Sequence, residues 1–137
     1  MAGEKELRCL LAGTQISDAV EGLRDILASY ESEKKVPDKE DRDILIAFYK
    51  SLEDSIAAAK KDCDLNTSGL AEVNGLTVDQ NMTELGNLLR HGGTTPSSRW
   101  LYYFHAGLYA SAIHDTIQAT AAIGSGMNWE IESMLAD

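Results

Sequence analysis

Apolar side chains recur at every third or fourth position along most of this chain, and this spacing constrains the fold more than any other feature. Residues three or four apart share one face of an α-helix, whereas β-branched residues form no alternating runs that would indicate strands. Helix-breaking proline occurs only at positions 37 and 96. The pattern predicts an all-α protein, and 137 residues suit a single helical domain over residues 1–137.

Capping and turn residues divide the chain into helical segments. We expect helices over residues 4–31, 38–63, 77–91 and 96–123, the third opening with a capping box at Thr77–Gln80. Gly124-Ser125-Gly126 is expected to stop the fourth helix, and Asn128 to cap a short last one. The prediction is a compact bundle of four main helices plus a short C-terminal cap helix. The helix over 96–123 should be central, because it is apolar nearly all round.

The first helix carries two sets of apolar residues that point in different directions. The face that begins at Ile16 does not include Leu7, Leu10 and Leu11, and Gly13-Thr14 lies between the two sets. Either the helix breaks there, or its first turns contact a different part of the molecule.

The acidic composition excludes some classes of partner. A formal net charge of −10 argues against direct nucleic-acid binding, which needs a basic surface. An acidic surface that imitates nucleic acid stays open, although acids alternate with Lys and Arg in the N-terminal half. The most apolar stretch, residues 100–113, is too short to span a membrane.

The two cysteines and three histidines form no metal-ligand pattern. No secretory signal precedes Cys9, so we expect a cytoplasmic protein in which Cys9 and Cys63 stay reduced and unbridged. The spacing of His105 and His114 puts them on opposite sides of one helix, and His91 lies at the end of another. We therefore expect no metal and no cofactor.

One set of residues could suggest a nucleophile with its base. Ser111 and His114 lie one turn apart on a helix, but the adjacent Asp115 is expected to point elsewhere and not to orient His114. The sequence accordingly predicts no catalytic residues and a protein that is not an enzyme.

Aromatic residues gather at the start of the fourth predicted helix, next to an arginine. Because Trp, Tyr and Arg often dominate protein interfaces, we predict partner-binding residues at this cluster and in the cap helix. They are Arg99, Trp100, Tyr102, Tyr103, Tyr109 and Trp129.

Two functions follow from this cluster. The first is a non-catalytic protein–protein interaction module, acting as a small inhibitor, antagonist or adaptor of a larger partner. Self-association into a homodimer through the charge-poor C-terminal half is also expected. The alternative is a bundle that binds a nucleotide-like or aromatic small molecule, or a small enzyme, through Arg99, Trp100 and the neighbouring aromatics. A flat exposed patch favours the first, and a concave pocket with Arg99 at its mouth favours the second.

Overall fold

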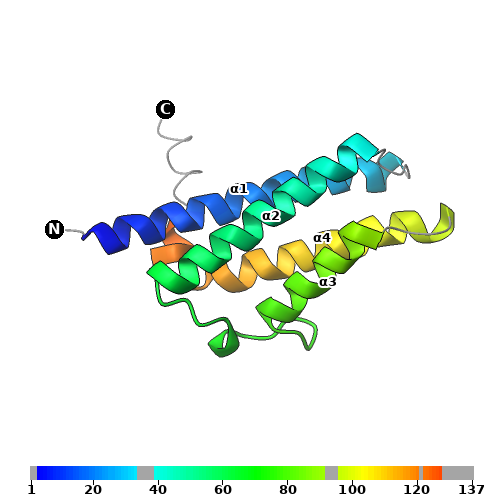
Figure 1. The fold of residues 1–137 in the computed structure, drawn as a ribbon. Helices are drawn as coiled ribbons and strands as arrows, with labels where there is room; N and C mark the ends of the chain where they lie inside the picture. The colour runs from blue at the N-terminus through cyan, green and yellow to red at the C-terminus, as the bar shows by residue number, and fades with distance from the viewer. Residues whose placement is uncertain (1–2, 34–38, 92–95, 121, 128–137) are drawn as a thin grey trace.

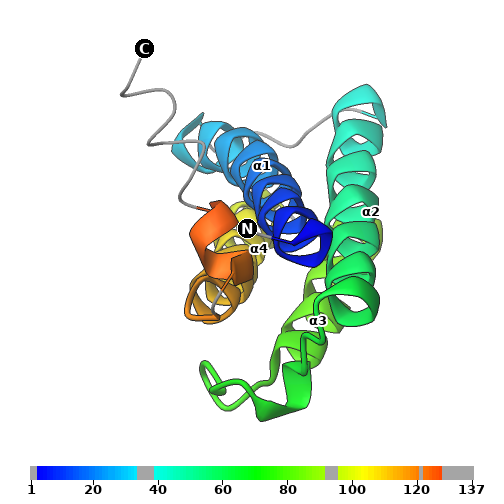
Figure 2. The ribbon, with the colours of Figure 1, turned by 90° about the vertical axis from the view of Figure 1, so that its left-hand side faces the viewer.

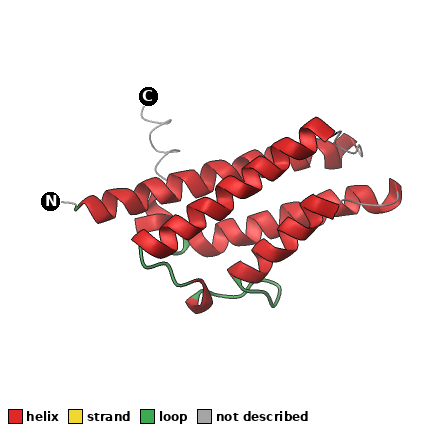
Figure 3. Cartoon of the chain, in the orientation of Figure 1, coloured by secondary structure: helices red, strands yellow, loops and turns green. Residues whose placement is uncertain are grey.

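The protein folds into four main helices, as the sequence predicts. The computed structural model describes residues 3–33, 39–91, 96–120 and 122–127, with the backbone alone at 31, 33, 91 and 96–103. The elements in chain order are α1 (Glu4–Glu33), α2 (Lys39–Asp62), the 3-10 helix η1 (Thr67–Gly69), α3 (Val78–His91) and α4 (Pro96–Gln118). Figures 1 and 3 show this all-helical arrangement. Within the described residues, β-structure is limited to one bridge between Val73 and Leu76. The C-terminal cap helix expected after Asn128 lies outside the described residues.

The helices form two neighbouring pairs, α1 with α2 and α3 with α4, and the pairs meet where α1 packs against α4. α1 packs against α2 and α4, and α3 packs mainly against α4. The end-on view of Figure 2 shows α1 between α2 and α4. The prediction of a central fourth helix is therefore wrong. α4 has two principal neighbours, as α1 does, and Phe104 and Leu108 on α4 remain exposed.

The apolar faces of α2 and α3 form much of the core. Helical spacing brings one stripe of α2 inward, and the neighbouring Ile44 is 41% exposed. Tyr49 links the two helices, since its hydroxyl donates to the carbonyl of Met82 at 3.0 Å. A Cβ on Gly86 would lie 2.6 Å from the same hydroxyl, so any larger residue there would have to displace the Tyr49 ring. The buried residues of α2 are Leu45, Tyr49, Leu52, Ser55, Ile56 and Ala59.

Local signals at the start of α3 have the expected geometry. The Gln80 N–H donates to Thr77 Oγ1 at 3.2 Å, and the Thr77 N–H donates to Gln80 Oε1 at 2.9 Å. These two bonds confirm the capping box. Just before it, Asn74 and Gly75 take positive φ angles of 56° and 77° in a tight turn. Asn-Gly suits such a turn because both residues tolerate the left-handed region.

The helix does not break at Gly13-Thr14, which excludes one of the two alternatives left by the sequence, whereas Leu7 and Leu11 of the first apolar set are exposed. α1 is continuous across Gly13. Residues 122–127 form a helical segment that crosses α1 there. A Cβ on Gly13 would overlap the carbonyl oxygen of Ile123, and one on Gly126 would overlap that of Leu10. The hydroxyl of Thr14 donates to the Gly126 carbonyl at 3.0 Å. We call this crossing the Gly13–Gly126 contact.

α4 ends earlier than the sequence predicts. It stops at Gln118 and not at Ile123, and Thr120 closes the end with its N–H on the Ile117 carbonyl at 2.9 Å. The chain then turns back, so that a Cβ on Gly124 would overlap the carbonyl oxygen of Gln118. Gly124 and Gly126 therefore do not stop the helix. They let the backbone of residues 122–127 pack closely against α4 and α1.

The cysteines form a disulfide, so the prediction of two reduced thiols is wrong. Cys9 on α1 is bonded to Cys63, just beyond the end of α2, with their Cα atoms 5.5 Å apart. The bond joins the beginning of α1 to the end of α2, where the antiparallel helices lie side by side (Figure 1). Disulfides persist in oxidising compartments, so this bond weighs against the cytoplasmic location expected from the sequence.

Candidate binding surface

The predicted partner-binding residues fall largely where the structure describes no side chains. Arg99, Trp100, Tyr102 and Tyr103 lie on the backbone of α4, and their side chains are outside the described part, as is all of Trp129. Tyr109 is described: it is partly buried and packs against the core. The role of these six residues therefore stays a prediction.

The next turns of α4 carry an exposed apolar surface that continues along the same helix. Phe104 is 40% exposed and Leu108 is 44% exposed. Residues four apart lie on one face of a helix, so positions 100, 104 and 108 form one line along α4. Gly107 lies between the two exposed side chains, and a Cβ there would have no neighbour within 4 Å. This part of α4 is open to another molecule.

A shallow groove runs between this surface and α1. It has a volume of 190 Å³. We call it the Phe104–Leu108 groove; its lining consists of Arg24, Leu27, Ala28, Phe104, Gly107, Leu108 and Ser111. Arg24 is exposed and is the one charged residue of this lining. No ion pair involves Arg24 within the described ranges. The groove thus combines apolar contacts with a cation that is free to bind a carboxylate.

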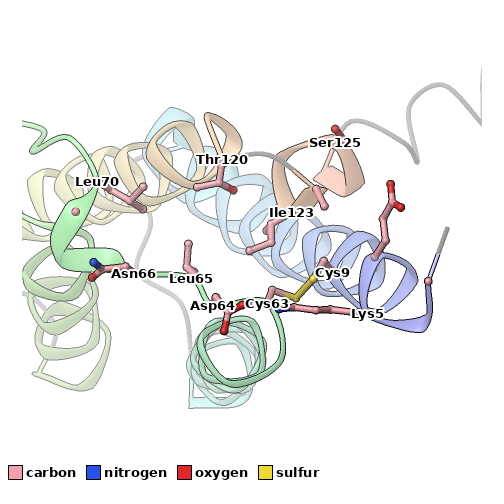
Figure 4. A pocket seen from close by; sticks show the side chains of 14 residues that line it. Lys5, Cys9, Cys63, Asp64, Leu65, Asn66, Leu70, Thr120, Ile123 and Ser125 are labelled. Carbon is pink, nitrogen blue, oxygen red and sulfur yellow. Dashed lines mark hydrogen bonds and ion pairs between the residues drawn. A yellow bond between two sulfur atoms is a disulfide. The ribbon is translucent and has the colours of Figure 1, made fainter.

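A larger cavity lies at the other end of the bundle. Its volume is 1070 Å³, and it opens where α1 begins, where α2 ends and where the chain turns back after α4 (Figure 4). The Cys9–Cys63 disulfide forms part of its wall, beside an ion pair between Lys5 and Asp64. Leu65, Leu70 and Ile123 supply apolar lining, and Asn66, Thr120 and Ser125 supply polar groups. Tyr109, the one predicted partner-binding residue whose side chain is described, does not line this cavity.

Sequence reasoning missed the cavity because its wall comes from three separate segments. Residues 3–9, 63–70 and 120–125 meet there only through the packing of α1 against α2 and α4. None of these segments has a motif of its own. The paired cysteines were the available signal, because a bond between them would bring the first two segments together.

The arrangement around His114 differs from the expected one in one respect. Asp115 does reach His114: its Oδ1 lies 3.3 Å from Nδ1, so the prediction that it points elsewhere is wrong. Rotation about the side-chain bonds can bring the polar atoms of adjacent residues together although their Cα–Cβ bonds diverge. No hydrogen bond between Ser111 and His114 is present among the described residues. The hydrogen bond through which His114 would take the proton of a Ser111 nucleophile is therefore not seen in the described part of the chain.

The described residues also lack a metal cluster and a membrane span. Within 3–33, 39–91, 96–120 and 122–127, no group of three or more His, Cys, Asp or Glu side chains converges on one point. In the same ranges no helix combines the length and apolar character needed to cross a bilayer.

Comparisons with known proteins give no match. No protein-family model, no curated protein and no solved structure matches this chain.

Proposed function

We propose that this protein is a non-catalytic interaction module, which acts as a small inhibitor, antagonist or adaptor by binding a larger protein. The observation that carries the proposal is the pair of large apolar side chains, Phe104 and Leu108, exposed on either side of Gly107. A helix of a partner can approach closely at Gly107 and bury both side chains. Arg24 at the edge of the groove favours a partner helix that carries a carboxylate beside its apolar face.

The test compares surface variants of the full chain that change equally exposed residues. Partners are first captured from an extract of the native host, then purified and titrated against each variant. Phe104→Ser/Leu108→Ser and Arg24→Glu should weaken binding at least tenfold, about 1.4 kcal/mol or more. Ile44→Ser is the matched control, because Ile44 is 41% exposed on α2 and lies outside the groove. Equal binding by all variants, or no partner that binds directly, would refute the proposal.

Self-association through the same surface is part of the proposal. Sedimentation equilibrium at micromolar concentration should show a species of twice 14.9 kDa. Phe104→Ser/Leu108→Ser should return it to the monomer, and Ile44→Ser should not. A monomer at all concentrations would reject the homodimer and leave a different protein as the occupant of the groove.

Small-molecule binding is the second candidate, and the cavity of 1070 Å³ favours it. Ligand sites usually enclose about 300–1,000 Å³ and combine apolar walls with a few polar groups. The cavity has this composition, and Tyr109, the described member of the predicted partner-binding residues, does not line it. A thermal-shift screen of small apolar acids and amines tests it. Ala122→Phe, which fills part of the wall, should abolish any shift that the unaltered protein gives.

A further inference from the structure

The first turns of α1 expose two leucines on one face. Leu7 is 59% exposed and Leu11 is 56% exposed, more than any other large apolar side chain that the structure describes. They are four residues apart and so form one patch. The opposite side of α1 is buried through Cys9, Ala12 and Ile16, which contact the core. The Leu7–Leu11 patch is therefore an apolar surface that α2 and α4 do not cover.

The described chain ends at the edge of this patch. Residues 122–127 cross α1 at Leu10, Gly13 and Thr14, and Met127 is buried. Leu10 is three residues from Leu7, and Thr14 is three residues from Leu11, so the crossing lies beside the patch on the surface of α1. Ten residues follow Met127. As a helix they would extend about 15 Å, whereas Leu7 and Leu11 are separated by about 6 Å along α1.

The ten residues have the composition that such a patch would bind. Ile131, Met134 and Leu135 have the spacing of one apolar face of a helix. Glu130 and Glu132 provide negative charge close to that face. Arg8, next to Leu7, has no ion-pair partner in the described part of the chain, although Glu4 lies on the same side.

From these observations we propose that the Leu7–Leu11 patch is a docking site for a short acidic amphipathic helix, and that residues 128–137 of the same chain occupy it. The proposal is independent of the Phe104–Leu108 groove, because it concerns another helix and another occupant. It extends the Gly13–Gly126 contact by one further apolar layer on the outside of α1.

Hydrogen–deuterium exchange of the full chain tests the docking. A helix of ten residues is marginal in water by itself, so slow exchange of amides 130–136 requires contact with the rest of the protein. We expect these amides to exchange at least tenfold faster in Leu7→Ser/Leu11→Ser. Leu108→Ser, which alters a 44% exposed leucine on α4, should leave their exchange unchanged. The reciprocal variant Ile131→Ser/Leu135→Ser should give the same acceleration, while exchange in α2 and α3 stays slow in every variant.

Three outcomes would overturn the proposal. Amides 130–136 could exchange at the rate of an unstructured peptide in the unaltered protein, or keep their protection in both leucine variants. Protection that is lost on dilution from 50 to about 0.5 μM would instead identify a second copy as the source of the helix.

Discussion

On two faces of this bundle a glycine leaves room for another segment to approach, but only one of the two faces is occupied. At the Gly13–Gly126 contact each glycine is covered by the backbone of another segment, so no side chain could be added. At Gly107 on α4 the equivalent space is empty, and Phe104 and Leu108 beside it are exposed. The first face is filled by the chain itself, whereas the second remains open.

This difference limits what small residues on a helix indicate. Small residues recur along residues 106–112 and could let a second helix approach closely. Ala106, Ala110 and Ala112 are instead buried within the bundle, and Gly107 alone among the small apolar residues there faces an open space. A glycine therefore marks a place where backbone can approach, but the packing around it decides whether that place is occupied.

The largest expected effect on stability comes from the disulfide, which joins the beginning of α1 to the end of α2. Cys9 and Cys63 are separated by 54 positions, and closing a loop of that length restricts the unfolded chain by about 4 kcal/mol in the chain-entropy description. Cys9→Ser/Cys63→Ser should lower the free energy of unfolding by up to that amount, as measured by urea denaturation. Adding a reductant should destabilise the unaltered protein and leave the double variant unchanged. Two titratable thiols in the native protein would contradict the bond.

The next largest effect on stability is expected from substitutions that break the Gly13–Gly126 contact. Gly126→Ala and Gly13→Ala each put a Cβ into a backbone carbonyl oxygen, so the two segments must separate. Each substitution should cost about 3 kcal/mol of stability, the upper part of the usual range for overpacking. Thermal and urea unfolding followed by circular dichroism measure it. Stability equal to that of the unaltered protein would show that the two backbones do not approach closely.

Gly107→Ala tests the open face of α4 and can be compared with the two substitutions at the Gly13–Gly126 contact. The added methyl group meets nothing within 4 Å, and alanine favours a helix over glycine by about 1 kcal/mol. The protein should therefore become slightly more stable, the opposite sign to Gly13→Ala and Gly126→Ala. If the groove binds a partner closely at Gly107, the same substitution should weaken that binding. A loss of stability in the isolated protein would mean that the groove is already filled.

Helix positions could be predicted from the sequence because their signals are local. The capping box at Thr77 and the start of α4 at Pro96 depend on residues within one turn. The end of α4 could not be predicted in this way. Gly124 and Gly126 have the composition of a helix stop, but their missing Cβ atoms serve contacts with Gln118 and Leu10, which are set by tertiary packing.

The disulfide was predictable from information in the sequence, although we expected free thiols. Cys9 lies 24 residues before the end of α1, and Cys63 lies 24 residues after the start of α2. In two antiparallel helices joined by a short link, equal distances from the link put both residues at the same level. The exposure of Phe104 and Leu108 was not predictable, because α4 is apolar on most sides and the pattern does not indicate which side its neighbours cover.

The smallest expected effect on stability comes from Asp79. Its side chain joins α3 to the end of α2 and to η1 through polar contacts, in contrast to the glycine contacts. Its carboxylate accepts hydrogen bonds from Lys60 at 2.9 Å and Thr67 at 2.7 Å. Burial raises the pKa of Asp79, but these bonds and the Lys60 charge outweigh it and hold the pKa below its usual value. A carboxyl group with a lowered pKa stabilises the fold above its unfolded pKa of about 4 and loses that contribution as the pH falls through the folded pKa.

Asp79→Asn should thus cost about 0.5 kcal/mol of stability at pH 7, given the exposure of the pair, and almost nothing at about pH 2. Urea titrations at both pH values measure this, with Asp54→Asn as control, because the Lys50–Asp54 pair is 3.7 Å apart and more exposed. An equal cost of Asp79→Asn at both pH values would show that the charge of Asp79 does not contribute.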